Sequence, residues 1–171
     1  RAVVLATEEP VANRILGIDG PNRAWNAVDC LYFSLPEKEL PATSPILHLD
    51  GSGMGPINNL TFLSTLSDCA PPGRALASAS VIGKKEMGID QVFELANQQL
   101  RTWFGESVKK WDFLRAYRIR HAVPNCDVVP DLETKKNGIY RCGDYLGLPS
   151  IDSAMRSGRL VAESIIASNK E

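Results

Sequence analysis

The sequence Ala-Leu-Ala-Ser-Ala-Ser-Val-Ile at residues 75–82 decides the fold class. Its side chains alternate between the two sides of an extended chain, and both sides are small or apolar, which is typical of a central strand. A Pro-Pro-Gly turn at residues 71–73 separates it from another strand candidate at residues 59–67. Because a connection of this kind suits an antiparallel pair, we expect a sheet with antiparallel neighbours.

Further strand candidates lie on both sides of this pair. They are residues 26–35, which Pro36 ends, residues 45–50, residues 113–121 and residues 139–142. Several strands joined by turns, together with helices, predict the α+β class, with a mixed, largely antiparallel sheet and packed helices. The glycine-rich residues 51–55 fit neither a dinucleotide-binding nor a P-loop pattern, so we interpret them as a flexible connection.

Three helices are predicted. The first follows Thr7, a candidate cap, and ends before Gly17. The second and longest covers residues 91–104 after Asp90 as its cap, and the third covers residues 150–167. The apolar stripe of the second helix comprises Val92, Ala96, Leu100, Trp103 and Phe104.

Composition excludes several classes of protein. The chain has 171 residues, is 44% hydrophobic and 23% charged, and carries a net charge of −1, so it resembles an average globular domain and offers no electrostatic argument for nucleic acid. No apolar run approaches the roughly 20 residues that a membrane span needs. The scattered cysteines, without zinc-site spacing, predict no metal site and a reducing compartment. Because no secretory signal is visible either, we expect an intracellular location, cytoplasmic or plastid-type. They are Cys30, Cys69, Cys126 and Cys142.

The candidate functional motif of the sequence is the segment at residues 143–158, which reads Gly-Asp-Tyr-Leu-Gly-Leu-Pro-Ser-Ile-Asp-Ser-Ala-Met-Arg-Ser-Gly. A strand ends in Gly143 and Asp144, and a loop leads to a helix capped by Ser150. Small side chains on the first turns allow close approach to a backbone or a flat ligand, and free amides suit an anion or a carbonyl oxygen. The residues alone favour an ordinary terminal helix packed on a sheet, with Asp144 in a turn.

This segment resembles the C-terminal flavin-contacting motif of FAD-dependent amine oxidases, phytoene desaturases and protoporphyrinogen oxidases. Residues 3–10 are similar to the strand that leaves the FAD domain of that superfamily, and residues 111–124 are similar to the segment before its final loop. Ser153 stands where the family often has glycine. The matching motif positions are Gly143, Asp144, Ser150, Ile151, Asp152, Ala154, Ser157 and Gly158.

The resemblance implies that the chain is the C-terminal portion of a flavoprotein. Residues 1–138 would be mainly the substrate-binding domain, with residues 1–7 a strand leaving the FAD domain, and residues 139–171 would be the last strand and helix of the FAD domain. The Gly-x-Gly-x-x-Gly turn for the FAD pyrophosphate, which this sequence lacks, would belong to an N-terminal FAD-binding half. The isolated chain is then expected to be inactive and to hold FAD weakly or not at all.

The same resemblance implies which residues contact FAD and what the whole protein does. Asp144 would bind the ribityl–pyrophosphate region, the helix start would face the flavin, and Ala154 and Met155 would pack nearby. The implied cofactor-binding set is Gly143, Asp144, Ser150, Ile151, Asp152, Ala154 and Met155. The reaction would move a hydride from a C–H bond of a small apolar substrate to flavin, and no catalytic residue is identified.

Several alternatives stay open. Amine, carotenoid and porphyrinogen substrates are all compatible with the sequence, and the strands between residues 26 and 82 either line an apolar pocket or form ordinary core. Self-association through an exposed domain interface is a further prediction. The competing interpretation from another class is a non-catalytic α+β binding or interaction domain, because a fold does not establish a function.

Overall fold

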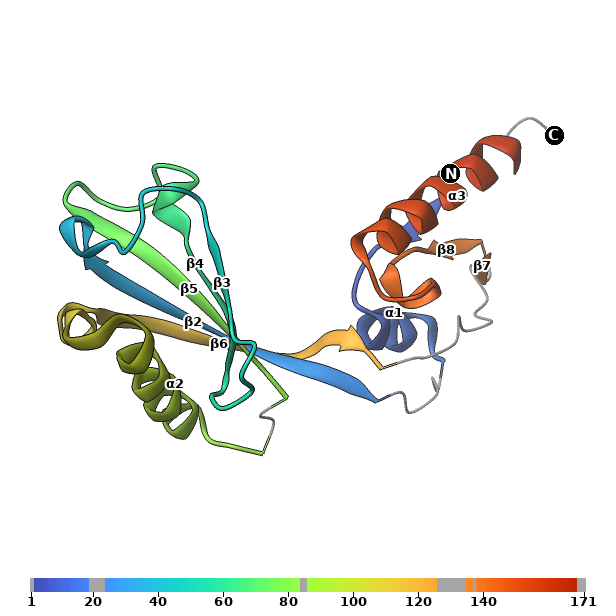
Figure 1. The fold of residues 1–171 in the computed structure, drawn as a ribbon. Coiled ribbons are helices and arrows are strands. Elements are labelled where there is room, and N and C mark those ends of the chain that lie inside the picture. The colour runs from blue at the N-terminus through green and yellow to red at the C-terminus, as the bar shows by residue number, and fades with distance from the viewer. Residues whose placement is uncertain (1, 19–23, 84–85, 126–134, 137, 169–171) are drawn as a thin grey trace. The chain divides into compact units, whose positions relative to one another are not determined.

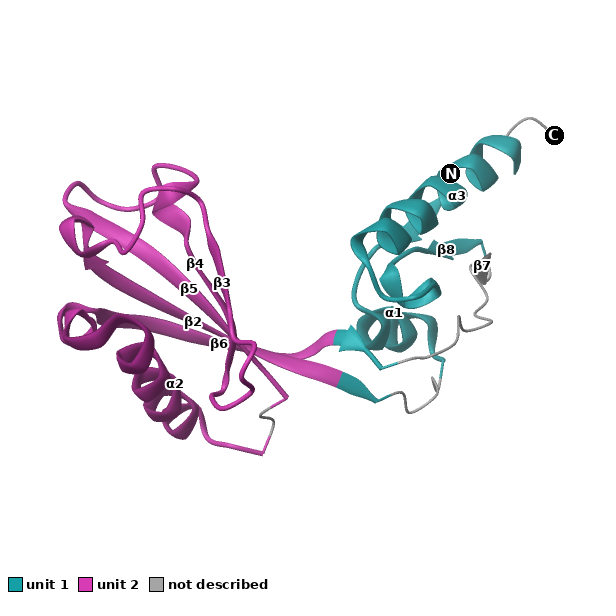
Figure 2. Cartoon of the chain, in the orientation of Figure 1, with its two compact units in different colours: residues 1–25, 123–171 teal, residues 26–122 magenta. Residues whose placement is uncertain are grey.

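A computed structural model describes residues 2–18, 24–83, 86–125, 135–136 and 138–168. It divides into two compact units (Figure 2): unit 1 contains residues 1–25 and 123–171, and unit 2 contains residues 26–122. The sequence Gly20-Pro21-Asn22 predicts a turn, and residues 124–137 predict a polar loop. That turn, Cys126 and most of that loop lie outside the described residues. The predicted mixed α+β class, with a largely antiparallel sheet and packed helices, is confirmed.

Unit 2 is built on a five-stranded sheet in the order β3-β4-β5-β2-β6 (Figure 1). The strands are β2 (Trp25–Pro36), β3 (Leu47–Leu49), β4 (Ile57–Phe62), β5 (Arg74–Ile82) and β6 (Asp112–Pro124). The prediction of β5 as a central antiparallel strand is confirmed, since it pairs antiparallel with both β2 and β4. The predicted strand at residues 59–67 was too long, because the chain turns at Phe62 into a short 3₁₀ helix, η2 (Leu63–Thr65). A similar turn, η1 (Glu37–Glu39), follows β2.

The helix α2 (Ile89–Phe104) covers one face of this sheet (Figure 1). Its predicted apolar stripe is confirmed, since Val92, Ala96 and Leu100 are fully buried. Asp90 is not the cap: the helix begins one residue earlier, and the Asp90 carboxylate lies in the first turn, where negative charge is favourable. Gly105 ends the helix with a φ of +64° and leads into η3 (Gly105–Lys110).

The core of unit 2 lies between α2 and the sheet. The sheet contributes the side chains that face the helix, which are Leu31, Phe33, Leu35, Ile57, Leu60, Phe62, Ala75, Ala77, Ala79 and Val81. The small alanines of β5 allow the helix to approach closely, and each large side chain that is buried contributes roughly 1.5–3 kcal/mol. Burial of this one face is sufficient to fix the register of β5.

A buried ion pair links β2, β6 and the segment that precedes α2. The Arg118 guanidinium donates two hydrogen bonds of 2.7 Å to the Asp29 carboxylate and a third, of 2.8 Å, to the Met87 carbonyl oxygen. Asp29 is only 3% exposed. The hydrogen bond from Arg118 to Asp29 raises the pKa of Arg118. The pairing of residues 89 positions apart was not predicted from the sequence.

Gln99 of α2 connects the helix to an irregular position in β4. The Ile57 amide donates to Gln99 Oε1 over 2.7 Å, and Gln99 Nε2 donates to the Ile57 carbonyl over 3.2 Å. The register of β4 against β5 shifts between Ile57 and Asn59. At this irregular position the side-chain amide of Gln99 supplies hydrogen-bond partners for the backbone of Ile57. The apolar stripe predicted for this helix does not include Gln99, so this contact was not predicted from the sequence.

Unit 1 contains a three-stranded sheet and two helices. Its elements are β1 (Val3–Leu5), α1 (Glu9–Leu16), β7 (Lys135–Lys136), β8 (Ile139–Arg141), η4 (Asp144–Leu146) and α3 (Ile151–Ser168). β1 is parallel to β8, and β7 is antiparallel to it. The continuous apolar run at the start of the chain predicts a strand buried on both faces. This prediction is wrong for the described residues, since Val3 and Val4 are 56% and 42% exposed.

The end of α1 was predicted correctly from the sequence, but its start was not. α1 ends at Gly17, which has a φ of +60°, as expected. Thr7 does not cap it, since the Thr7 hydroxyl donates to the adjacent Glu8 carbonyl. None of the helices in the described part of the chain is long and apolar enough to cross a membrane.

Candidate functional site

The segment predicted to contact a cofactor lies where β8 ends and α3 begins. Gly143 follows β8, and Asp144 begins the short helix η4 with a half-buried side chain. A Cβ atom at Gly143 would lie 2.3 Å from Tyr145 Cε1, so the buried Tyr145 ring excludes any larger residue at this position. The glycine at position 143 therefore has a structural reason in this chain.

Ser150 caps α3, as predicted. The Ser153 amide donates to Ser150 Oγ over 3.0 Å. Ser153 Oγ in turn donates to the Leu148 carbonyl over 2.5 Å, which fixes the loop against the first turn. Among the described residues, the amides of Ile151 and Asp152 are left as the open donors of this helix start.

A hollow of about 530 Å³ lies beside this helix start. Its lining residues are Leu146, Gly147, Leu148, Ser150, Asp152, Ser153, Arg156, Ser157 and Leu160. The structure thus brings Ser150 and Asp152 of the predicted set together at one hollow. Gly143, Asp144 and Ala154 do not line it. Ile151 and Met155 are 83% and 72% exposed and do not pack on unit 1.

Ser157 was not included in the predicted cofactor set, although it matches the motif. Its hydroxyl accepts a hydrogen bond of 2.9 Å from the Gly143 amide and lies 3.0 Å from the Gly143 carbonyl oxygen and 2.8 Å from that of Ala154. The residue is buried. Ser157 therefore holds the second turn of α3 against the backbone that carries Asp144, and only the three-dimensional structure shows this contact.

We expect the substitution Ser157→Ala to lower the free energy of unfolding of unit 1 by about 1–3 kcal/mol, because the Gly143 amide loses its partner. Urea denaturation followed by circular dichroism measures the change. Ser164→Ala is the matched control, since Ser164 is an exposed serine of the same helix and its loss should change stability by less than 0.5 kcal/mol or so. Equal effects of the two substitutions would show that the contact does not stabilise unit 1.

Buried polar side chains lie beneath the site. Arg141 of β8 and Glu9 of α1 are 4% and 3% exposed, and Arg141 Nη1 donates to Asn13 Oδ1 over 3.1 Å. Tyr145 is 1% exposed, and this burial raises its pKa to about 12. The phenol is therefore neutral throughout the physiological range, and it cannot act as a base there.

The Tyr145 pKa predicts how the stability of unit 1 changes in alkali. The pKa is raised from 10.0 to about 12 on folding, so the stabilisation is complete below pH 10 and is lost as the pH rises through 12. A difference of this size corresponds to a loss of about 3 kcal/mol. Tyr145→Phe should remove this part of the pH dependence, measured as the difference in urea midpoint between the variant and the wild type. Tyr117→Phe, at an exposed tyrosine, should not.

The described part of the site offers hydrogen-bonding groups, and we assign no acid–base role to any side chain in it. The open amides and the Ser150 cap suit an anionic or carbonyl oxygen, and the Asp144 carboxylate can accept from hydroxyl groups. No group of three or more His, Cys, Asp or Glu side chains within the described ranges is placed to hold a metal ion. The thiols of Cys30, Cys69 and Cys142 are free.

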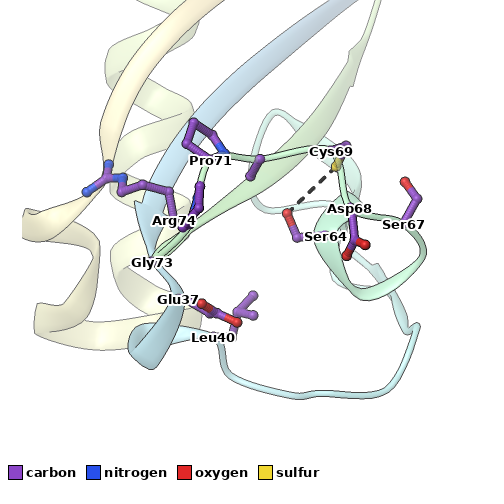
Figure 3. Close-up of a pocket in the computed structure, with 11 residues that line it drawn as sticks. Glu37, Leu40, Ser64, Ser67, Asp68, Cys69, Pro71, Gly73 and Arg74 are labelled. Carbon is purple, nitrogen blue, oxygen red and sulfur yellow. Dashed lines mark hydrogen bonds between the residues drawn. The ribbon is translucent and has the colours of Figure 1, made fainter.

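A second hollow, of about 300 Å³, lies in unit 2 beside the turn between β4 and β5 (Figure 3). Figure 3 shows Ser64 and Cys69 facing each other, with Ser64 Oγ 3.7 Å from Cys69 Sγ. The same Ser64 oxygen accepts the Leu76 amide over 2.9 Å, and the Glu37 amide donates to the Gly73 carbonyl. These hydrogen bonds stabilise the turn, so the residues that line this hollow have a structural role.

Comparison with known proteins identifies the fold and not the family. No protein-family model and no curated protein sequence matches the chain. Among solved structures, a proposed protoporphyrinogen oxidase from an Exiguobacterium species aligns with 96% of this chain and 40% of its own, at 14% identity and a TM-score of 0.65. An oxidoreductase from Methanosarcina mazei aligns with 91% of this chain and 37% of its own, at 16% identity and a TM-score of 0.59.

A protein from Pyrococcus furiosus is similar over 88% of this chain and 33% of its own, at 15% identity and a TM-score of 0.53. The chain therefore spans two fifths or less of the length of these structures. At such identities the likeness establishes a shared fold. It covers both units.

Proposed function

We propose that this chain is part of an FAD-dependent oxidoreductase, in which unit 1 contributes to the cofactor site and unit 2 is the substrate-binding domain. The observation that carries the proposal is the fold likeness over 96% of the chain to a proposed protoporphyrinogen oxidase, and over 91% to an oxidoreductase. The flavin-motif resemblance at residues 143–158 supports it independently. Unit 1 contains residues from both ends of the chain. This division is expected when a substrate domain is inserted between two segments of a cofactor domain.

The residues of unit 1 fit FAD in the chemistry of their donors. The open amides at the start of α3 and the hollow beside Ser150 and Asp152 suit the polar edge of a flat ring. Asp144 would accept hydrogen bonds from ribityl or ribose hydroxyl groups, and Ser157 would hold Asp144 and the helix start at a fixed separation. Exposed Ile151 and Met155 would be covered by the cofactor or by the N-terminal half.

Bound FAD would supply a hydride acceptor for a C–H bond of the substrate. The reaction type proposed from the sequence is that of a phytoene desaturase or an amine oxidase, acting on a small substrate. The residues of unit 1 would orient the cofactor, and no catalytic residue is assigned. The further parts of the proposal are an N-terminal FAD-binding half as partner, self-association through an exposed interface, and an intracellular location.

The coding sequence upstream of Arg1 tests the proposal directly. We expect it to encode a strand followed by Gly-x-Gly-x-x-Gly and, about twenty residues further on, an acidic residue for the ribose. A start codon immediately before Arg1 would instead favour the non-catalytic binding domain. A second test is FAD titration of the 171-residue chain: weak or no binding is expected, and tight stoichiometric binding would contradict the assignment of the phosphate site to the proposed N-terminal half.

A further inference from the structure

Two oppositely charged side chains line the hollow beside the start of α3 without pairing to each other. Asp152 and Arg156 stand four residues apart on the helix, with the acid nearer the N-terminus, which is the favourable order for an ion pair. The ion pairs found in the described part of the chain nevertheless include neither residue. Both side chains border the hollow of about 530 Å³ instead.

The following turns of α3 show that side chains at this spacing do pair on this helix. Arg159 and Glu163 are also four residues apart, in the less favourable order, and Arg159 Nη1 donates to Glu163 Oε1 over 2.7 Å. Neither of them lines the hollow. Long side chains on a helix lean toward its N-terminus, and Arg156 accordingly borders the hollow together with Ser150, which caps that end. An uncompensated cation and an uncompensated carboxylate therefore line one hollow.

The same hollow also has an apolar part. Leu146, Leu148 and Leu160 line it, and Leu148 and Leu160 are 52% and 48% exposed. These leucines offer nothing to a small inorganic anion, whereas a pure hydrocarbon would leave both charges without a partner. The ligand that suits this lining has a flat apolar body and a polar edge, with acceptors for the guanidinium and a donor for the carboxylate.

The isoalloxazine ring of FAD has this pattern of groups. Along one edge, carbonyl oxygens flank a ring N–H, and the fused rings behind that edge are apolar. Hydride transfer to the ring places negative charge on the same edge. A cation that contacts the edge stabilises the reduced ring more than the oxidised ring, and so it raises the reduction potential.

We propose that Arg156 contacts the polar edge of the flavin in this hollow and raises its reduction potential, while Asp152 accepts a hydrogen bond from the ring N–H. This inference deepens the proposed function and rests on it for the identity of the ligand. It gives a role to a residue outside the predicted cofactor-binding set, since Arg156 is not one of the matching motif positions.

Redox titration of the whole flavoprotein that contains this chain, against a dye of known potential, tests the proposal. We expect Arg156→Gln to shift the balance between reduced and oxidised cofactor about tenfold toward the oxidised form, which lowers the potential of a two-electron couple by about 30 mV. Arg156→Lys keeps the charge and should restore most of the shift. Asp152→Asn removes a negative charge from the same hollow and should raise the potential.

Arg159→Gln is the matched control. It removes the same charge from the same helix, but Arg159 pairs with Glu163 and does not line the hollow. We expect its potential to equal that of the wild type. An unchanged potential in Arg156→Gln, or equal shifts in the two arginine variants, overturns the proposal. Because Arg156 is exposed, its replacement should leave the urea midpoint unchanged, so a structural role would not account for the shift.

The outcomes separate this proposal from the proposed function. A whole protein that binds no FAD overturns the oxidoreductase and, with it, the ligand of Arg156. A flavoprotein in which Arg156→Gln and Arg159→Gln have the same potential keeps the proposed function and removes Arg156 from the cofactor site.

Discussion

Replacing Arg118 with methionine should lower the free energy of unfolding of unit 2 by about 3–5 kcal/mol. The substitution leaves the Asp29 carboxylate buried at 3% exposure without the two hydrogen bonds that compensate its lost hydration. The Met87 carbonyl loses its donor in the same step. Urea denaturation followed by tryptophan fluorescence measures the loss as a shift in the midpoint.

Two further variants test whether the loss of stability comes from breaking the Arg118–Asp29 ion pair. Arg120→Met removes an exposed arginine from the same strand, and we expect its effect to stay within about 0.5 kcal/mol. The double variant Asp29→Leu/Arg118→Met should recover much of the stability, because it no longer buries an unpaired charge. If Arg118→Met were as mild as Arg120→Met, the ion pair would not contribute to the stability of unit 2.

Asp144→Ala, made in the whole protein that contains this chain, should weaken FAD binding about ten- to a hundredfold. Loss of a charged acceptor for hydroxyl donors corresponds to roughly 1.5–3 kcal/mol. The measurement is the flavin retained per chain after dialysis against increasing volumes of buffer. Asp144→Asn keeps one acceptor oxygen and should fall between the wild type and the alanine variant.

The control for Asp144 is Glu163→Gln. Glu163 is an exposed carboxylate on α3 that pairs with Arg159 across one helical turn, so its loss changes the charge of unit 1 equally without touching the proposed site. We expect its flavin content to match the wild type. Unchanged flavin occupancy in Asp144→Ala would remove Asp144 from the site.

The sequence predicted burial best for the elements that pack against a single layer of the fold. The alternation at β5 and the stripe of α2 predicted their burial because each contacts a single partner layer, and Gly17 and Gly105 ended helices at the expected positions. Ser150 could be predicted as a cap because capping is local, within three residues.

Contacts between distant residues could not be predicted from periodicity. Hydrogen bonds join Arg118 to Asp29, Gln99 to Ile57, and Ser157 to Gly143, and each forms only when the tertiary fold brings the two residues together. The spacing of the apolar residues in α3 puts Ile151 and Met155 on one stripe, but helical periodicity does not show whether this chain supplies the surface that covers them. Their exposure of 83% and 72% shows that unit 1 does not.

The FAD content of the whole natural protein tests the central claim most directly. We expect the protein that contains this chain, purified without added cofactor, to show flavin absorbance equivalent to about one FAD per chain, and to release FAD on denaturation. We also expect that absorbance to bleach when a reductant is added in the absence of oxygen. A purified, folded protein without flavin, which takes up none when FAD is supplied, would contradict the assignment to the FAD-dependent oxidoreductases.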